Sequence, residues 1–227
     1  MQINQVFDEM SDGYTGKITR WVPYYQQLIS SISTNLPTNF KPYRILDLGC
    51  GNGNVTQLLH KRFPEAHFTL LDASEEMIGI CQRRFSIVKN IEYRIGFFQE
   101  VDFEAASFDL IAAGLSLHHL RSEEKRAFFP RLHRWLRKGG QFTFSDLLID
   151  KDDEPGHSEH LQLWEHYARE RGTTSEEWAY IMDHYDTYDH PDGINKQLKW
   201  LAEAGFDQAQ CTWQERWWCN VRAEKGA

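Results

Sequence analysis

The stretch ILDLGCGNGN, residues 45–54, decides the fold. Its first residues alternate apolar side chains with the carboxylate of Asp47, so residues 44–48 are predicted to form a short buried strand. Glycines at 49, 51 and 53 then make a turn, and a helical pattern begins directly after it at Asn54. A strand, a glycine turn and a helix start together present free backbone N–H groups to a ligand, and glycine lets that ligand approach closely.

The same alternation of strand and helix continues along the chain. Strands are predicted at 67–72, 91–95, 108–113 and 141–148, and helices at 54–63, after the N-cap Ser74, at 122–136 with Ser122 as cap and Gly139–Gly140 as stop, and at 194–204. Two last strands, 207–213 and 217–222, are predicted to pair as an antiparallel hairpin at the sheet edge. This order predicts an α/β fold with a doubly wound, seven-stranded, mainly parallel sheet.

Two further regions flank this pattern, and both are expected to cover the ligand side of the sheet. Amphipathic segments at 3–11 and 17–34 predict an N-terminal helical lid within residues 1–40. The acidic, aromatic-rich stretch 150–191 is irregular in its pattern and is predicted to be a cap insert. The whole of 1–227 is expected to form one domain.

Composition narrows the classes of partner. The net charge of −8 and the absence of a Lys/Arg cluster argue against nucleic acid. The N-terminus lacks the pattern of a signal peptide, and no stretch is apolar enough for a membrane span. The four cysteines have no framework spacing, so free thiols and a cytoplasmic location are expected.

An acid at the tip of the second strand indicates the class of ligand. Asp72 lies 23 residues after Gly49, where a carboxylate accepts hydrogen bonds from ribose hydroxyls. A nicotinamide dinucleotide would favour glycine where this chain has Asn54, and Asp47 would repel its pyrophosphate. An ammonium and a sulfonium suit that carboxylate better. The loop therefore favours S-adenosylmethionine (SAM) over NAD.

Four stretches carry a resemblance to a known family. ILDLGCGNGN, LLDASEEMI at 70–78, FDLIAAGLSLHHL at 108–120 and LRKGGQFTFSD at 136–146 resemble the motif series of class I SAM-dependent methyltransferases of the small-molecule type. The later LKWLAEAGF and two strands are similar to the end of that fold. The resemblance implies SAM as methyl donor, S-adenosylhomocysteine as product, and contacts to SAM from Asp47, Gly49, Cys50, Gly51, Asp72, Ala73, Met77, Gly114 and Leu115.

Two parts of the SAM site depart from the family or leave a choice. Relatives often have an Asp after the third strand that binds adenine, but this chain has Phe97 and Phe98, whose backbone groups are expected to make that contact instead. FDEMSDGY, residues 7–14, resembles the family's lid and implies that Tyr14 lies near SAM. Lys17 and Arg20 compete for the methionine carboxylate, and Arg20 is preferred because its guanidinium can bind bidentately.

Methyl transfer from a sulfonium depends mostly on positioning and needs a base only if the acceptor arrives protonated. His118 and His119, just past the fourth strand, are the candidate catalytic residues, although either could simply pack or cap the loop. Asp146, near the end of the fifth predicted strand, also points to the substrate side, or it caps a helix or is solvated.

The cap insert supplies the candidate substrate residues. Trp164 and Tyr167, with His160, share one helical face, and Tyr185 belongs to the same aromatic set. These side chains could form a cage for a cationic amine, the core of a helical lid, or a homodimer contact. His157/His160 and Asp186/His190 lack the further ligands that zinc requires, so no metal is expected.

The function predicted from the sequence is methyl transfer from SAM to a small-molecule acceptor. Three alternatives stay open: a SAM-binding enzyme of other chemistry similar to carboxy-SAM synthase, an NAD-linked oxidoreductase, and a SAM-binding module without catalysis. The acceptor atom and the oligomeric state are not fixed by the sequence.

Overall fold

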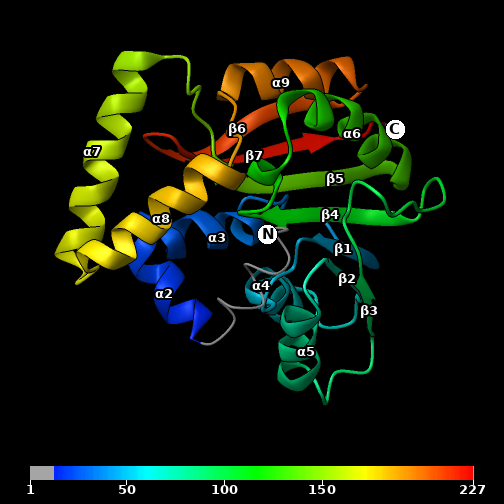
Figure 1. The fold of residues 1–227 in the computed structure, drawn as a ribbon. Helices are drawn as coiled ribbons and strands as arrows, with labels where there is room; N and C mark the ends of the chain where they lie inside the picture. The colour runs from blue at the N-terminus through cyan, green and yellow to red at the C-terminus, as the bar shows by residue number, and fades with distance from the viewer. Residues whose placement is uncertain (1–12, 227) are drawn as a thin grey trace.

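The computed structural model describes residues 13–226 of the chain (Figure 1). Strands and helices alternate as the glycine loop predicted. The elements are α2 (Tyr14–Trp21), α3 (Tyr25–Thr34), β1 (Arg44–Leu48), α4 (Asn54–Arg62), β2 (His67–Asp72), α5 (Glu75–Arg84), β3 (Ile91–Ile95), β4 (Phe108–Gly114), the 3₁₀ turn η1 (Leu117–His119), α6 (Ser122–Trp135), β5 (Leu136–Leu147), α7 (Glu154–Glu170), α8 (Ser175–Tyr188), α9 (Ile194–Glu203), β6 (Asp207–Glu215) and β7 (Trp218–Glu224).

The seven strands form one sheet in the order β3-β2-β1-β4-β5-β7-β6. Strands β1 to β5 pair in parallel, whereas β7 pairs antiparallel with both β5 and β6. The strand order therefore reverses at β1, where a crevice opens at the carboxyl ends of β1 and β4. This confirms the predicted doubly wound sheet with a reversed edge hairpin.

Successive side chains of β1 point to opposite faces of the sheet. Ile45 is buried with Leu28 of α3 and Leu59 of α4, whereas Leu46 is buried with Phe128 and other residues of α6. This alternation is what a strand buried on both faces requires. The aromatic residues of α7 and α8 join the first of these two cores, so the cap packs directly on the sheet and lid.

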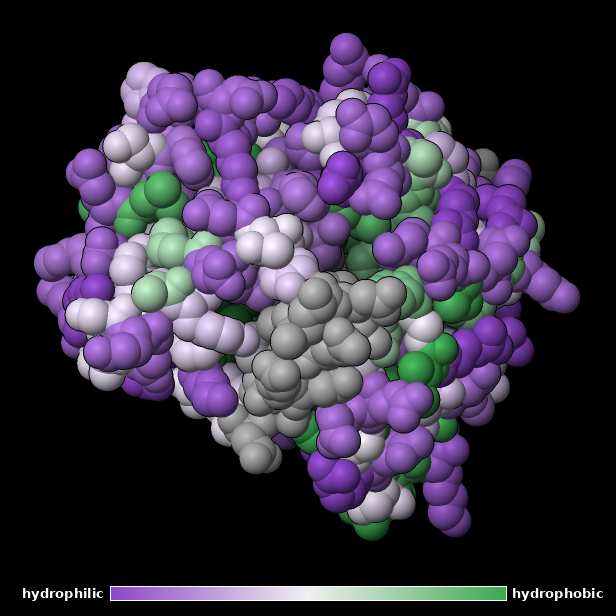
Figure 2. Space-filling model, viewed as in Figure 1, coloured by the Kyte–Doolittle hydropathy of each residue, from purple (hydrophilic) through white to green (hydrophobic). Residues whose placement is uncertain are grey.

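Figure 1 shows where the covering helices lie: α2, α7 and α8 gather beyond one end of the sheet, and α6 and α9 lie along another side. The face seen in Figure 2 is mostly hydrophilic, with apolar residues in scattered patches. Within residues 13–226, no helix combines the length and hydrophobicity needed to cross a bilayer.

The structure corrects three predicted boundaries. The segment 17–34 is two helices, because Val22 before Pro23 is extended and Tyr24 is left-handed. The segment 3–11 lies outside the described residues.

Helix α6 and strand β5 also differ from the prediction. Arg121 is the N-cap of α6, and its backbone N–H donates to Glu124 Oε2 at 2.7 Å, whereas the Ser122 hydroxyl donates to Asp192. Gly139 and Gly140 do not end the helix but lie within β5, which begins at Leu136. The register of β5 against β4 shifts across these glycines. They therefore make a bulge in the strand.

Candidate active site

The glycine loop after β1 folds back over the neighbouring strand. The N–H groups of Gly49 and Cys50 both donate to the carbonyl of Leu71, at 2.8 and 3.1 Å. Gly49 has a φ of 64°, and a Cβ there would lie 2.5 Å from the Cβ of Ser116. Only glycine fits this close approach of the loop to the segment after β4. The loop is thus fixed between the tips of β2 and β4.

Asp72 links the loop to the start of α5. Its Oδ2 accepts from the Gly51 N–H at 2.7 Å, and its Oδ1 accepts from the Ser74 N–H at 2.9 Å. The Ser74 hydroxyl in turn caps α5 by accepting from the Met77 N–H at 3.0 Å, as the sequence predicted. The carboxylate is therefore held by two backbone donors at the edge of a cavity.

That cavity, here called the loop cavity, lies between the glycine loop, the β2 tip and the end of β4. Most of the predicted SAM contacts line it, Arg20 and Asp47 being the exceptions. Its lining includes the predicted Tyr14, Gly49, Cys50, Gly51, Asp72, Ala73, Met77, Phe97, Phe98, Gly114 and Leu115, and also Tyr25, Ile29, Asn52, Asn54, Val55, Gln99, Ser116, His119 and Leu120.

Asp47 lies beneath the loop and does not line the cavity. It has no exposed surface, and it accepts a hydrogen bond from the Thr56 hydroxyl of α4 at 2.5 Å. Burial raises the pKa of this carboxyl to about 7, and the nearby Asp72 adds to the shift. Asp47 therefore cannot contact a ligand directly and can act on it only through its charge, from beneath the loop.

Arg20 also lies away from the loop cavity. Its guanidinium pairs with Glu177 of α8 at 2.7 Å and donates to the carbonyl of Gly172. The structure thus gives Arg20 a different contact from the expected one: it joins α2 to the cap. The lid meets the loop through other groups, since Asn52 Nδ2 donates to the Thr15 hydroxyl and Asn54 Nδ2 to the Tyr25 hydroxyl, each at 2.7 Å.

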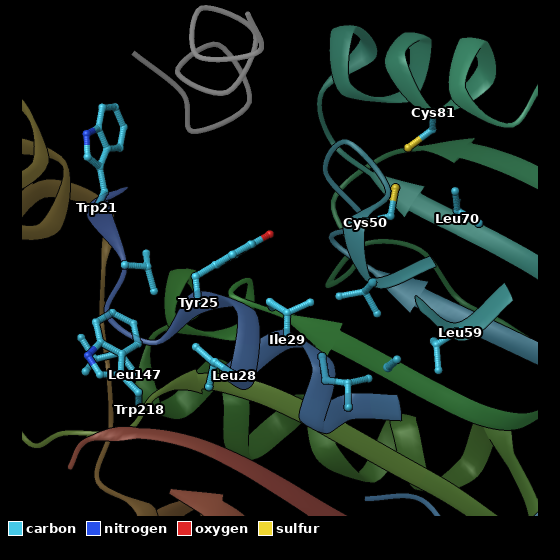
Figure 3. Packing of buried hydrophobic residues seen from close by; sticks show 14 of the residues in the cluster. Trp21, Tyr25, Leu28, Ile29, Cys50, Leu59, Leu70, Cys81, Leu147 and Trp218 are labelled. Carbon is cyan, nitrogen blue, oxygen red and sulfur yellow. The ribbon is translucent and has the colours of Figure 1, made fainter. Parts of the chain in front are cut away.

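A second cavity, here called the aromatic cavity, adjoins the first. Tyr14, Leu115 and His119 line both. In Figure 3, Tyr25 extends from α3 toward the loop of Cys50, while Leu147 and Trp218 lie together on the other side, with Trp21 above them in the view. The lining of the aromatic cavity is Tyr14, Ile18, Trp21, Val22, Leu115, His118, His119, Leu147, Trp164, Tyr180, Ile181, His184, Asp189, Pro191 and Trp218.

Leu115, at the junction of the cavities, has a backbone that leucine rarely adopts. Its φ is 56°, in the left-handed region, and its N–H donates to the carbonyl of Ser145 at 2.8 Å. Such a conformation persists only where the surroundings enforce it, and it is most common at functional sites. In this conformation Leu115 lies between the glycine loop and the aromatic cavity.

The polar part of the aromatic cavity is a cluster of three imidazoles and two carboxylates, here called the histidine corner. The ring nitrogen His118 Nδ1 lies 2.5 Å from Asp146 Oδ1, and the backbone N–H of His118 donates to Asp146 Oδ2. Asp189 Oδ1 is the common neighbour of the imidazoles, at 3.6 Å from His118 Nε2, 3.2 Å from His119 Nδ1 and 3.3 Å from His184 Nε2.

The charges in this corner are divided unequally. Burial alone would lower the pKa of His118, but Asp146 and Asp189 raise it to about 9. Burial, with His118 beside it, lowers the pKa of His119 to about 4. Burial alone would raise the pKa of Asp189, but the neighbouring histidines hold it well below its ordinary value. The apo site therefore contains a charged and a neutral imidazole side by side.

The three candidate substrate residues do not share one cavity. Trp164 lines the aromatic cavity and donates from its indole N–H to the carbonyl of Trp21. Tyr167 lies in an outer groove that His160 and Trp164 also line, and its hydroxyl accepts from the Tyr24 N–H. Tyr185 is buried against Trp164 and hydrogen-bonds His157. Neither tyrosine lines the aromatic cavity, because the Tyr167 hydroxyl turns to the backbone of the lid at Tyr24 and Tyr185 of α8 is packed in the core.

Several lining residues escaped the sequence prediction. Trp21, Ile181, His184, Asp189 and Trp218 come from four separate parts of the chain. The one local signal was DHYDTYDHP, residues 183–191, in which polar and ionisable residues are dense. The pairs His157/His160 and Asp186/His190 were weighed as ligands, whereas the cluster that the structure brings together is His118, His119 and Asp189.

Comparison with known proteins agrees with this geometry. Residues 45–140 match the family described as "Methyltransferase domain". A trans-aconitate 2-methyltransferase of Yersinia pestis is 31% identical over 73% of this chain and 69% of its own length. The chain therefore belongs to the class I SAM-dependent methyltransferases. It is an enzyme of that class, and its methyl donor is SAM.

Other relatives extend over more of the chain. A carboxy-S-adenosyl-L-methionine synthase of Campylobacter fetus is 24% identical over 95% of this chain and 87% of its own length. The human N-acetylserotonin methyltransferase, solved with SAM, shares the fold with a TM-score of 0.60 at 16% identity, over 99% of this chain. The chain spans only 56% of that human protein.

The residues of the loop cavity fit SAM chemically. Asp72 offers carboxylate oxygens where ribose hydroxyls would lie, and Ala73, Met77 and Phe97 give apolar surface for a purine. Asp47 places a titratable carboxyl below the loop, where it favours a cationic ligand.

Proposed function

We propose that this enzyme transfers the methyl group of SAM to a small, uncharged acceptor held in the aromatic cavity. The observation that carries the proposal is the junction of the two cavities at Leu115, His119 and Tyr14. A donor in the loop cavity and an acceptor in the aromatic cavity would meet there in line. SAM supplies a methyl group on a positively charged sulfur, and the chain supplies position and exclusion of water.

The lining of the aromatic cavity supports the choice of an uncharged acceptor. Among the described residues, no Lys or Arg lines it, and its charged imidazole, His118, already faces Asp146 and Asp189, so an acceptor carboxylate would enter without a free cation to pair with. Trp21, Trp164 and Trp218 give broad apolar surface instead. The histidine corner would receive the nucleophilic oxygen or nitrogen and help it lose a proton. Of the two candidate catalytic residues, the neutral His119 would take up that proton, whereas the charged His118 would orient the acceptor or stabilise its developing negative charge.

A panel of matched acceptors tests this choice. Phenols and aromatic amines would be compared with the same rings carrying a carboxylate, and S-adenosylhomocysteine formation would be measured. We expect turnover with neutral members and little with carboxylated ones. Faster turnover of the carboxylated members would contradict the proposal.

The carboxy-SAM synthase alternative has one observation in its favour, the match to such relatives over nearly the whole chain. It is tested directly by mixing SAM and prephenate with the protein and searching for carboxy-SAM by mass. Since prephenate is anionic, the cavity without Lys or Arg argues against it. Formation of carboxy-SAM would replace methyl transfer as the assigned activity.

The SAM site has its own test. Asp72→Ala should weaken SAM binding by ~1–3 kcal/mol, about 5- to 150-fold, because a charged hydrogen-bond acceptor and an anchor of the loop are both lost. Calorimetric titration with SAM measures it. Glu76→Gln, an exposed acid in the first turn of α5, is the control and should leave the affinity unchanged. Equal affinity of Asp72→Ala and the unaltered protein would disprove the assignment.

We also propose that the protein works in the cytoplasm, because its four cysteines are all free thiols. The homodimer stays a prediction.

A further inference from the structure

The histidine corner gathers three metal-ligating groups from two distant parts of the chain. His118 and His119 belong to η1, directly after β4, and Asp189 follows α8. One candidate ligand atom from each of the three lies within 4.8 Å of the other two. All three side chains are largely buried, with 13%, 13% and 11% exposed. The cap thus brings a carboxylate to a pair of imidazoles that are fixed by the sheet.

The separations within this cluster suit a tetrahedral metal. Zinc binds imidazole nitrogen and carboxylate oxygen at about 2.0–2.2 Å, so two ligand atoms at the tetrahedral angle lie about 3.3 Å apart. Asp189 Oδ1 is 3.2 Å from His119 Nδ1 and 3.6 Å from His118 Nε2. The candidate atoms of the two imidazoles lie within 4.8 Å of each other, so the side chains would draw together around an ion.

Neighbouring groups orient the ligands as at known metal sites. His118 directs Nδ1 to Asp146, which leaves Nε2 facing Asp189, and a carboxylate behind a ligating histidine is the usual arrangement. His184 Nε2 lies 3.3 Å from the same oxygen of Asp189. The cluster therefore has three ligands and two supporting groups.

Asp189 Oδ1 lies at the centre of the cluster. This atom is buried, and its neighbours are ring nitrogens of His118, His119 and His184, at 3.6, 3.2 and 3.3 Å. A buried carboxylate oxygen needs donors or cations around it. A metal ion at the centre of the cluster would take the place of the protons that these imidazoles present to it.

We propose that His118, His119 and Asp189 bind one divalent transition-metal ion, with Zn²⁺ as the best match, and leave its fourth position open to the aromatic cavity. Three protein ligands and one open position are typical of catalytic zinc. This site was not expected from the sequence, because Asp189 is 70 residues from His119 and only the cap joins them.

The role of the ion rests on the proposed function, whereas its binding does not. An acceptor hydroxyl at the open position would lose its proton to solvent more readily, because the ion stabilises the oxyanion. The oxygen would then form a bond to the methyl carbon as the bond from carbon to sulfur breaks, and sulfur keeps the electron pair. In this arrangement His118 and His119 act as ligands, and the ion does the work that a base would do.

Titration of the chelator-treated full-length protein with Co²⁺ alone tests the site. We expect one equivalent to give the visible absorption of a tetrahedral Co²⁺ complex, and Zn²⁺ to displace it. Asp189→Asn and His118→Gln should weaken the binding by about 10- to 100-fold or more. His166→Gln, on an exposed side chain of α7, is the matched control and should bind as the unaltered protein does.

The readouts separate this inference from the proposed function. Retained SAM affinity shows that each variant is folded, so loss of Co²⁺ binding then supports the site. Absence of a Co²⁺ spectrum in the unaltered protein, or the same spectrum and affinity in Asp189→Asn, would overturn it. Undiminished methyl transfer by the metal-free protein would overturn the catalytic role of the ion, but not its binding, and would leave the proposed function intact. Co²⁺ binding without any SAM binding would support the metal site and contradict the proposed function.

Discussion

The carboxyl group of Asp47 is fully buried and out of contact with water. It lies between the sheet and α4, with the Thr56 hydroxyl as its donor. Burial raises its pKa to about 7, far above the value of an exposed Asp. Such a position is unfavourable for an ionised group unless a positive charge comes near. The cation that the proposed ligand would bring to the loop is the natural partner.

Asp47→Asn should change how stability depends on pH. In the folded protein Asp47 holds its proton up to about pH 7, whereas in the unfolded chain it releases it near pH 4. Native stability therefore falls as pH rises through this window and stays lower above it. The Asn variant lacks this loss and should be more stable than the unaltered protein at pH 8 by up to about 4 kcal/mol, and about equal at pH 4.

Urea unfolding of both proteins from pH 4 to pH 8, without ligand, measures this difference. Glu104→Gln, on an exposed loop residue, is the control and should show no such trend. A constant difference between Asp47→Asn and the unaltered protein at every pH would show that Asp47 does not titrate in this range.

At single positions, the sequence predicted those residues whose role is local. The spacing of Gly49, Gly51 and Asp72 follows from one strand–turn–helix unit, and these residues line the loop cavity as expected. His184 and Asp189 act only because α8 folds back over η1. No pattern near them in the chain specifies that contact.

Among the elements, the connection between α6 and the segment after α8 determines where Asp189 lies. Lys125 of α6 is fully buried, and its ammonium pairs with Asp192 at 2.7 Å and donates to the carbonyl of His190. Ser122 donates to the same Asp192. A charged group with no exposed surface requires such partners. This contact joins the cap to the sheet beside the histidine corner.

Lys125→Met should lower the free energy of unfolding by ~3–5 kcal/mol, because it leaves Asp192 buried without its partner. Denaturant unfolding measures the loss. Lys199→Met, at an exposed residue of α9, should change stability by less than about 0.5 kcal/mol. Combining Lys125→Met with Asp192→Leu should recover most of the stability, since no lone charge remains. A double variant as unstable as the single one would mean that the ion pair is not the cause.

Element boundaries could be predicted where one local rule decides them, as at β1 and β2. The predicted boundaries were wrong where two local rules competed. Gly139 and Gly140 are a common helix stop, but Leu136 already pairs with Phe108 of β4, and both glycines hydrogen-bond Lys225 after β7, so the strand extends through them. In the cap, the helical periodicity is hidden by polar and aromatic residues on every side. Thr174 and Glu177 nevertheless form a capping box that the sequence TTSEEW already contained.

Across the whole molecule, the two cavities belong to different parts of the fold. The loop cavity is built mainly from the βα units, whose motifs are local in sequence. The aromatic cavity is lined by residues of α2, α7, α8 and strand β7, and these helices lie beyond one end of the sheet (Figure 1). The loop cavity, our proposed donor site, could therefore be predicted from sequence, whereas the aromatic cavity, our proposed acceptor site, depends on long-range packing. The same separation should allow one site to be altered without the other.

Ile181→Phe tests this independence. Ile181 of α8 lines the aromatic cavity and not the loop cavity, so a larger side chain there should exclude acceptor but leave SAM in place. We expect roughly a tenfold or greater loss of kcat/KM for the acceptor. The dissociation constant of SAM should stay within about twofold of its original value. Ile181→Leu keeps the volume and should behave as the unaltered protein. Overpacking could lower stability by about 1–3 kcal/mol, so thermal unfolding is recorded alongside. A fall in SAM affinity in parallel with acceptor turnover, in a folded variant, would show that the two cavities form one site. The assignment of donor and acceptor to separate cavities would then be wrong.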